Sequence, residues 1–228
     1  MKPLILLHGA IGAKDQLQPL ADKLSKQYQV YTFSFSGHGG VTPANEPVSI
    51  DLFSRELKAF IDVHQLSEVS IFGYSMGGYV ALYLSRQFPG LIKNIATLAT
   101  KFEWSEEIAA KEVKMLDPEK IELKLPAFAK TLEMRHAPNS WKQLLLNTAD
   151  MMKAMGQDNP LKLSDFQAIT IPVLIMLGDR DKMVGLDETV SVYKSLPCAQ
   201  MAVLPNTQHP IEQADINQLS QLINTFIG

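Results

Sequence analysis

The sequence predicts an α/β fold in which a mostly parallel sheet of six strands carries helices on both faces. Short apolar runs of strand length recur along the chain, and most are separated by stretches of helix length with apolar residues every three or four positions. Strands that are almost continuously apolar are typical of a parallel sheet covered on both faces. The predicted strands are residues 4–7, 29–33, 69–72, 92–98, 173–177 and 201–204.

The predicted helices lie between these strands, and several have recognisable ends. Ser49 can cap the start of one helix with its hydroxyl oxygen. Pro89 and Gly90 end another, because proline lacks an amide proton and glycine permits the backbone turn that follows. The predicted helices are residues 15–26, 49–64, 76–88, 187–195 and 212–226.

Residues 101–168 interrupt the alternation of strands and helices. This stretch contains no convincing strand and reads as several helices separated by X-Pro pairs. It follows the fourth predicted strand, and no Gly/Ser linker or internal repeat sets it apart. We therefore expect residues 1–228 to form a single domain, with residues 101–168 as a helical cap that folds over one edge of the sheet.

Composition limits the partners and the location that we expect. The chain has 228 residues, of which 46% are hydrophobic and 20% charged, so it can bury a substantial core. A net charge of −3 gives no basic surface for nucleic acid or an anionic membrane, and we expect a small-molecule partner and a monomer or homodimer. The apolar run before His8 is too short for a secretory signal, and Cys198 is the only cysteine, so we expect a cytoplasmic protein.

Residues 73–77, Gly-Tyr-Ser-Met-Gly, form the motif G-x-S-x-G between a predicted strand and a predicted helix. This context is typical of a nucleophilic serine on a sharp turn, where Gly73 and Gly77 avoid collisions with neighbouring backbone. The amide of Met76 opens the helix, where free N–H groups favour negative charge. In the loop after the first strand, the amide of Ala10 is the best candidate for a second oxyanion donor, with Ile11 next.

A serine nucleophile also needs a base and a group that orients the base. His209 follows the last predicted strand, and both Asp179 and Asp181 follow the fifth. Because the carboxyl ends of parallel strands meet at one edge of a sheet, these side chains can reach Ser75. The chain order Ser, Asp, His is one of the known orders of catalytic triads. His8, at the end of the first strand, is better explained by hydrogen bonds to nearby backbone.

The stretches "LLHGAIG", "FSGHGG", "FGYSMGG", "GDRDKMV" and "TQHP" together resemble the serine hydrolases of the alpha/beta-hydrolase family over essentially the whole chain. The resemblance implies that Ser75 is the nucleophile, His209 the general base and Asp181 the carboxylate that orients it. It also implies that Ala10 and Met76 supply the oxyanion amides. The family's G-x-x-D pattern selects Asp181 over Asp179.

Two departures from the family pattern are visible. Ser34 occupies a position where the family usually has an aspartate, and we expect only a local structural change there. The family's N-terminal antiparallel hairpin is missing, because the chain opens on the strand that carries His8. The sheet is therefore expected to be all parallel.

The cap is rich in methionine and aromatic residues, which predicts an apolar and deformable pocket over the serine. We expect the substrate to contact Ile11, His38, Trp104, Met151, Met152 and Met183. No His/Asp/Glu cluster has the spacing of metal ligands, and no glycine-rich loop has the form of a nucleotide site. Neither a metal nor a cofactor is expected.

The leading functional hypothesis is hydrolysis of carboxylic esters or thioesters of small to medium apolar substrates through an acyl-enzyme. Carbon–carbon bond hydrolysis, lactone opening and an elimination by His209 use the same three residues and stay open. Serine at position 75 disfavours the family branches with an aspartate nucleophile. A different class of answer is a hydrolase-fold ligand receptor with little turnover, which steady cleavage of an ester distinguishes from an enzyme.

Overall fold

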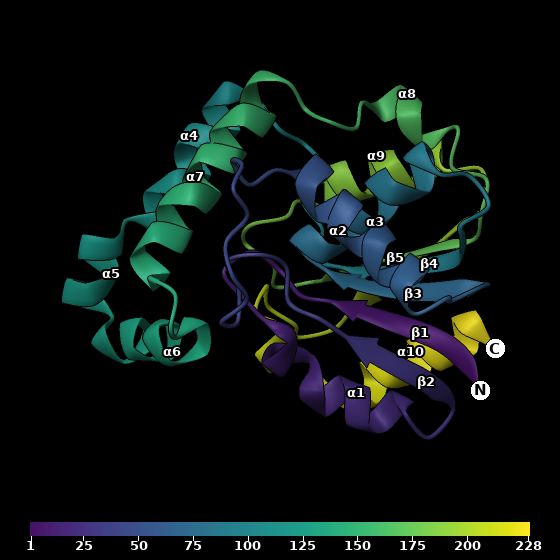
Figure 1. The fold of residues 1–228 in the computed structure, drawn as a ribbon. Helices are drawn as coiled ribbons and strands as arrows, with labels where there is room; N and C mark the ends of the chain where they lie inside the picture. The colour runs from purple at the N-terminus through teal and green to yellow at the C-terminus, as the bar shows by residue number, and fades with distance from the viewer.

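A single sheet of six parallel strands organises the structure, a computed structural model that describes residues 1–228 (Figure 1). The predicted α/β class and the all-parallel six-stranded sheet are confirmed, and no predicted strand end moves by more than two residues. The spatial order is β2-β1-β3-β4-β5-β6. The strands are β1 (Lys2–Leu7), β2 (Tyr28–Thr32), β3 (Val69–Tyr74), β4 (Ile92–Leu98), β5 (Val173–Gly178) and β6 (Ala199–Leu204).

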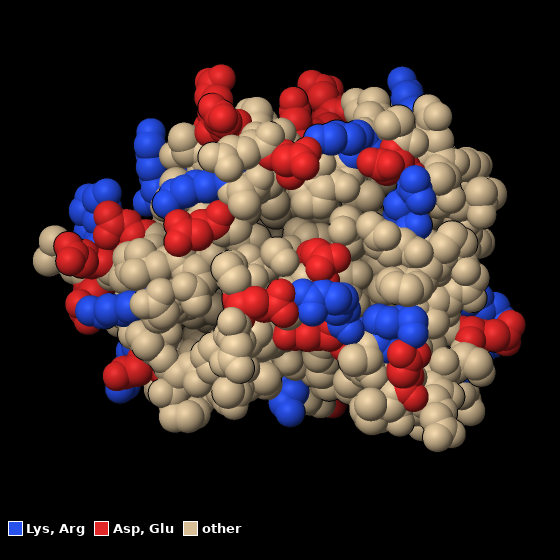
Figure 2. Space-filling model, turned by 45° about the horizontal axis from the view of Figure 1, so that its top comes forward, with Lys and Arg blue, Asp and Glu red and all other residues tan.

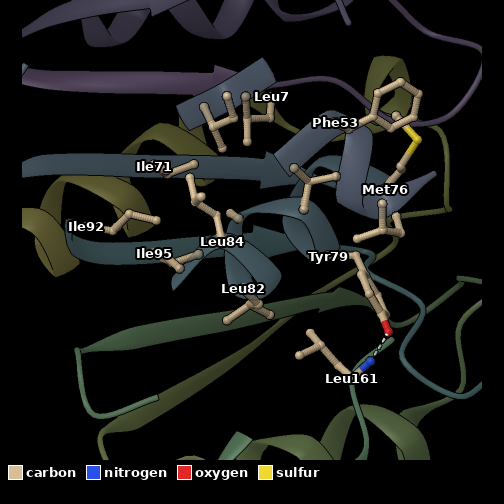
Figure 3. Packing of buried hydrophobic residues seen from close by; sticks show 14 of the residues in the cluster. Leu7, Phe53, Ile71, Met76, Tyr79, Leu82, Leu84, Ile92, Ile95 and Leu161 are labelled. Atoms are coloured by element: carbon tan, nitrogen blue, oxygen red, sulfur yellow. Dashed lines mark hydrogen bonds between the residues drawn. The ribbon is translucent and has the colours of Figure 1, made fainter. Parts of the chain in front are cut away.

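Helices cover both faces of the sheet, because alternate residues of each strand point to opposite sides. Leu4 and Leu6 of β1 join a core cluster with α1 (Gln18–Leu24) and α10 (Ile216–Ile227). Ile5 and Leu7 join the larger cluster, which includes residues of α2 (Ile50–Val63), α3 (Met76–Gln87) and α9 (Leu186–Ser195). Figure 3 shows part of this second cluster around β3 and α3. Burial on both faces is the reason for the continuously apolar strands.

Local capping decides where the helices begin. Ser49 caps α2 as predicted, because its hydroxyl oxygen accepts a hydrogen bond of 3.0 Å from the amide of Leu52. The last helix starts at Ile216 and not at residue 212, since Asp215 caps it by accepting hydrogen bonds from two backbone amides. A separate 3-10 turn at Ile211–Gln213 precedes it. The predicted helix 15–26 divides into a 3-10 turn (Lys14–Leu17) and α1.

The segment between β4 and β5 contains helices and no strand, and it lies mostly beyond the carboxyl ends of the strands, on the left of Figure 1. Pro118 and Pro126 each occupy the first turn of a helix, where the missing amide proton breaks no hydrogen bond. Its elements are α4 (Glu106–Glu112), a 3-10 turn (Val113–Leu116), α5 (Pro118–Lys124), α6 (Pro126–His136), α7 (Trp141–Gln157) and α8 (Leu163–Phe166). We refer to residues 101–168 as the cap.

The cap shares the core of the sheet and also has a small core of its own. Met151 and Met155 of α7 belong to the same cluster as Ile5 and Leu7 of β1. A second group of seven buried residues, which includes Trp141, packs within the cap itself. None of the helices combines the length and apolar character needed to cross a lipid bilayer.

Replacement of a central strand residue should destabilise the whole fold. Leu6 is fully buried, and we expect Leu6→Ala to lower the free energy of unfolding by about 2–5 kcal/mol through lost burial and the cavity left behind. Leu123 of the cap is 80% exposed, so Leu123→Ala should change that free energy by about 0.5 kcal/mol or less. Urea unfolding of both variants measures the difference. Equal losses in the two variants would contradict this account of the core.

Candidate active site

Ser75 lies on a sharp turn between β3 and α3, with φ 51° and ψ −117°. A positive φ is unfavourable for a residue other than glycine, so the surrounding structure must hold the turn. The Ser75 amide donates a hydrogen bond of 2.8 Å to the carbonyl of Leu98. The Thr100 hydroxyl donates one of 3.1 Å to the carbonyl of Ser75. Neighbouring β4 and the residues after it therefore fix the serine in this conformation.

The two glycines of the motif permit a close approach of backbone segments around Ser75. A Cβ atom at Gly73 would lie 2.4 Å from the Cα of Gly78, and one at Gly77 would lie 2.5 Å from the carbonyl oxygen of Leu7. Both distances are far below van der Waals contact. The sequence prediction that bulk at these positions would collide with backbone is confirmed.

Three side chains from three loops form a continuous chain of contacts above the sheet. Ser75 Oγ lies 3.3 Å from His209 Nε2, and His209 Nδ1 lies 2.8 Å from Asp181 Oδ2. The loops follow β3, β6 and β5, so all three residues come from the carboxyl edge of the sheet. When Nδ1–H donates to the carboxylate, the lone pair of Nε2 faces the serine hydroxyl. This arrangement can remove the hydroxyl proton.

Asp181 is held as a buried carboxylate. Its side chain is inaccessible to solvent, and its Oδ1 accepts hydrogen bonds of 2.8 Å from the amide of Met183 and 2.9 Å from that of Val184. Burial alone raises the pKa of Asp181. The hydrogen bond and charge of His209, together with the two amides, outweigh that effect and hold the pKa of Asp181 below its ordinary value.

Asp179 connects the loops after β5 and β6, and it is Asp181, not Asp179, that pairs with His209. Its Oδ1 accepts a hydrogen bond of 3.2 Å from the amide of Thr207, and its Oδ2 lies 3.7 Å from Arg180 Nε. These contacts hold the loops after β5 and β6 together. Tyr74 adds a further restraint, because its hydroxyl donates a hydrogen bond of 3.1 Å to the carbonyl of His209.

Two backbone amides beside Ser75 are available to stabilise negative charge. Ala10 and Met76 both line the pocket that contains Ser75. Met76 is the first residue of α3, where the N–H has no intrahelical acceptor and the helix dipole favours an anion. Ala10 lies inside a turn closed by a hydrogen bond of 3.1 Å from the Gly12 amide to the Gly9 carbonyl, and its own amide donates no backbone hydrogen bond. These two N–H groups can act as an oxyanion hole.

The pocket over Ser75 is narrow and mostly apolar. Its open volume is about 50 Å³. A single buried water needs roughly 10–15 Å³ counted in the same way, so the pocket accommodates only a small group. The predicted contacts Trp104, Met151, Met152 and Met183 do line it. The sequence analysis did not identify five other residues of the wall, which are Ile50, Tyr79, Lys101, Glu112 and Met155.

Lys101 could have been found from the sequence, whereas Glu112 could not. Lys101 lies three residues beyond the carboxyl end of β4, at the same edge of the sheet as the other functional loops. Glu112 is one of several glutamates on and beside α4, and its place in the pocket depends on how the cap packs.

Ile11 and His38 do not line this pocket, in contrast to the prediction. The side chain of Ile11 packs against the apolar cluster inside the cap. His38 is 1% exposed, and its ring lies 5.0 Å from that of His8 and 5.6 Å from that of Phe53, measured between ring centroids. Ile11 lines a neighbouring hollow that shares Glu112, Met152 and Met183 with this pocket, whereas His38 belongs to the packing of the loops.

Residues 2–117, just over half of the chain, match the family model of the alpha/beta hydrolase fold. The chain belongs to the alpha/beta hydrolase fold family. The matched segment includes Ser75, Met76 and Ala10 but ends before Asp181 and His209. The family resemblance inferred from the motifs is thereby confirmed.

The individual proteins similar to this chain carry the names of different activities. Ethanol acetyltransferase 1 of Hanseniaspora uvarum is 30% identical over 95 residues, which cover 41% of this chain and only 28% of that enzyme. Lipase 3 of a Moraxella species is 23% identical over 91% of this chain and 71% of the lipase. The crystal structure of the enol-lactonase from Burkholderia xenovorans superimposes with a TM-score of 0.81 at 14% identity, over 99% of this chain and 91% of that one.

Two buried histidines connect the loops around Ala10. His8 Nδ1 lies 2.8 Å from the carbonyl of Gly9, and its Nε2 accepts a hydrogen bond of 3.2 Å from the amide of Phe35. His136 of α6 lies 3.0 Å from the carbonyl of Ile11 through Nε2, and its Nδ1 accepts a hydrogen bond of 3.0 Å from an amide of the glycine-rich loop. Each ring therefore donates at one nitrogen and accepts at the other, which requires the neutral form.

The surroundings of both rings oppose protonation. Burial lowers the pKa of His8 to about 4; the hydrogen bond to Gly9 opposes this shift, and the nearby His136 and Arg135 add to it. Burial is also the main cause that lowers the pKa of His136. His136 ties the cap to Ile11, whose backbone has φ 54° and which follows Ala10 directly. The cap thus restrains the loop that carries the free amide of Ala10.

Stability should fall in mild acid because His8 stays neutral in the folded protein. As the pH falls below about 6.5, the unfolded chain binds a proton at His8 that the folded protein binds only near pH 4. We expect His8 to contribute a loss of about 2 kcal/mol in the free energy of unfolding between pH 7.5 and pH 5. Urea unfolding at both pH values should show a smaller loss for His8→Gln than for the wild type. The pKa of His8 can also be measured in the wild type by NMR titration. A value above 6 would refute this prediction.

Proposed function

We propose that this protein is a serine hydrolase that cleaves carboxylic esters or thioesters through an acyl-enzyme. The observation that carries the proposal is the contact chain from Ser75 Oγ to His209 Nε2 and from His209 Nδ1 to Asp181. It lies at a narrow apolar pocket with two free amides beside the serine. A nucleophile, a base, an orienting carboxylate and an oxyanion hole are the parts that acyl transfer requires.

The proposed reaction begins when His209 Nε2 takes the proton of Ser75 as Oγ attacks the substrate carbonyl. The carbonyl oxygen becomes negative and accepts hydrogen bonds from the amides of Ala10 and Met76. Asp181 stabilises the imidazolium formed on His209. The imidazolium gives its proton to the departing alcohol or thiol, which leaves an ester on Ser75. His209 Nε2 then takes a proton from water as the water oxygen attacks this ester. The imidazolium returns the proton to Ser75 Oγ as the bond to the acyl group breaks, and the acid is released.

The substrate is expected to be small, because the pocket is narrow and the charged surface gives no sign of a polymeric partner. Figure 2 shows Lys and Arg side chains interspersed with Asp and Glu over one face of the molecule. A lipase and an enol-lactonase are among the similar proteins, which supports an ester or lactone bond as the target. Met151, Met152, Met155 and Met183 line the pocket with flexible side chains. Methionine can adapt to acyl groups of different shape.

Loss of any member of the triad should abolish most turnover. We expect Ser75→Ala, His209→Ala and Asp181→Asn each to lower kcat/KM on a p-nitrophenyl ester by about three orders of magnitude or more, since the triad acts as a unit. Asp179→Asn is the matched control and should lower it far less, because Asp179 contacts Thr207 and Arg180. A fluorophosphonate should add one mass label to the wild type, at Ser75, and none to Ser75→Ala.

Four results would contradict the proposal, or part of it, in different ways. Labelling at another residue would exclude Ser75 as the nucleophile. Labelling of Ser75 without turnover of any ester would favour a ligand receptor. Turnover confined to a carbon–carbon bond substrate would assign the same residues to a different reaction. A larger loss in Asp179→Asn than in Asp181→Asn would exchange the roles of the two aspartates.

Acyl chain length should be limited by the methionine wall. Each methylene that fits the pocket can contribute up to about 0.8 kcal/mol, but the narrow cavity should make rates fall beyond short chains. Met152 is only partly buried, so Met152→Ala should widen the pocket with little loss of stability. We expect the optimum to shift toward longer acyl chains while the acetate rate stays within about twofold. The measurement is kcat/KM on p-nitrophenyl esters of increasing length, and an unchanged optimum would remove Met152 from the acyl site.

A further inference from the structure

The carboxylate of Glu112 lies at the active-site pocket without a hydrogen bond from the chain. Glu112 is the last residue of α4, its side chain is 5% exposed, and it lines the same pocket as Ser75. Its Oε2 is buried and has no hydrogen-bond partner. Its Oε1 lies 3.9 Å from Lys101 Nζ, which makes a long ion pair but is too far for a hydrogen bond.

Lys101 makes its hydrogen bonds to other groups. Its Nζ donates to the carbonyl of Met183 at 2.9 Å and to Glu188 Oε1 at 3.4 Å. Glu188 is further satisfied by the amides of Phe102 and Glu103, each at 2.9 Å. Glu188 and Lys101 therefore form a satisfied pair, and the carboxylate of Glu112 adds a negative charge beside it.

An unsatisfied polar group is costly in this location. A buried carboxylate that lacks hydrogen bonds loses its hydration without replacement, so buried charged groups in folded proteins normally have such partners. A second buried polar group of the same pocket, on Trp104, is a donor and not an acceptor. The indole Nε1–H of Trp104 is a donor without an acceptor. One wall thus offers an acceptor and another a donor, and the rest of the lining is mostly apolar.

A hydroxyl group can satisfy both residues at once. Its O–H can donate to Glu112, and its oxygen can accept from Trp104. Because the pocket measures only about 50 Å³, one small substituent can contact both walls. An ammonium group can donate to Glu112 but cannot accept from Trp104, and a methyl group can do neither.

We propose that Glu112 and Trp104 form a recognition site for a hydroxyl group of the substrate. The proposal rests on the ester hydrolysis proposed above and narrows its substrates to esters with a hydroxyl on a short carbon chain. Glu112 and Trp104 are specificity-determining residues in this scheme, while Ser75, His209 and Asp181 carry the reaction.

Matched esters in which a hydroxyl replaces a methyl group test the site on either side of the scissile bond. On the acyl side, phenyl 3-hydroxypropanoate is compared with phenyl butanoate. On the alcohol side, 3-hydroxypropyl acetate is compared with butyl acetate. Each kcat/KM is divided by the rate of hydroxide-catalysed hydrolysis of the same ester, which removes differences in intrinsic reactivity. In at least one pair, the wild type should prefer the hydroxyl ester by about tenfold or more, the usual size of a hydrogen bond to a charged group.

Variants separate recognition from packing. Glu112→Gln should reduce the preference to within about threefold, and Trp104→Phe, which removes the indole N–H, should reduce it in part. Glu107→Gln removes an exposed charge from the same helix and is the control that should keep the preference. If Glu112→Gln lowers every ester equally and lowers the melting temperature, Glu112 is part of the packing of the cap and the proposal is wrong.

Two further outcomes would overturn the proposal. Equal rates for hydroxyl and methyl esters in both pairs would exclude a polar recognition site. A preference for phenyl 3-aminopropanoate over the hydroxyl ester would identify a cation as the ligand in place of a hydroxyl.

Failure of the proposed function can be recognised separately. If no ester is cleaved, the hydrolase proposal fails, and binding is measured directly by NMR with butane-1,4-diol and pentan-1-ol. Tighter binding of the diol by the wild type but not by Glu112→Gln supports the recognition site, and equal binding overturns it.

Discussion

The close approach of β3 and α3 at Ser75 is the constraint on which the site depends. The chain turns sharply at Ser75, which has a positive φ. The neighbouring backbone leaves no room for a Cβ atom at positions 73 and 77, so the turn requires glycine at both. The turn directs the serine side chain toward the carboxyl edge of the sheet and leaves the first amide of α3 free. The Ser75 amide donates a hydrogen bond to Leu98 of β4, and the Thr100 hydroxyl donates one to the Ser75 carbonyl, so both hold Ser75 against the neighbouring strand and the loop after it.

The other components are arranged around this fixed point by parallel strands. Asp181 and His209 follow β5 and β6, and the Ala10 turn follows β1, so each arrives at the same edge as Ser75. The cap is the one part of the pocket that does not arrive on a strand of the sheet. His136 and the methionines of α7 attach the cap to the oxyanion loop and to the core, respectively. The chemistry is therefore set by the sheet, whereas the shape and polarity of the pocket are set mainly by the cap.

This division explains what could be predicted from the sequence. Strand boundaries and the three residues of the contact chain follow from local patterns, because apolar runs, glycine turns and strand ends are encoded within a few residues. Ile11 and His38 are the predicted contacts that do not line the pocket over Ser75, because proximity to the site along the chain does not fix the direction of a side chain. Ile11 turns toward the cap, and His38 is buried behind His8. Glu112 carries no local signal, since only the packing of α4 and α7 brings it to the pocket.

Methionines of α7 belong at once to the pocket wall and to the main hydrophobic core. Met151 and Met155 are each 5% exposed, join the cluster that includes Ile5 and Leu7 of the central sheet, and also face Ser75 across the pocket. A smaller side chain at either position enlarges the space for substrate and removes core contacts in the same step. Enlargement of the pocket through α7 is therefore coupled to a loss of stability, which compensating changes elsewhere in the core can offset.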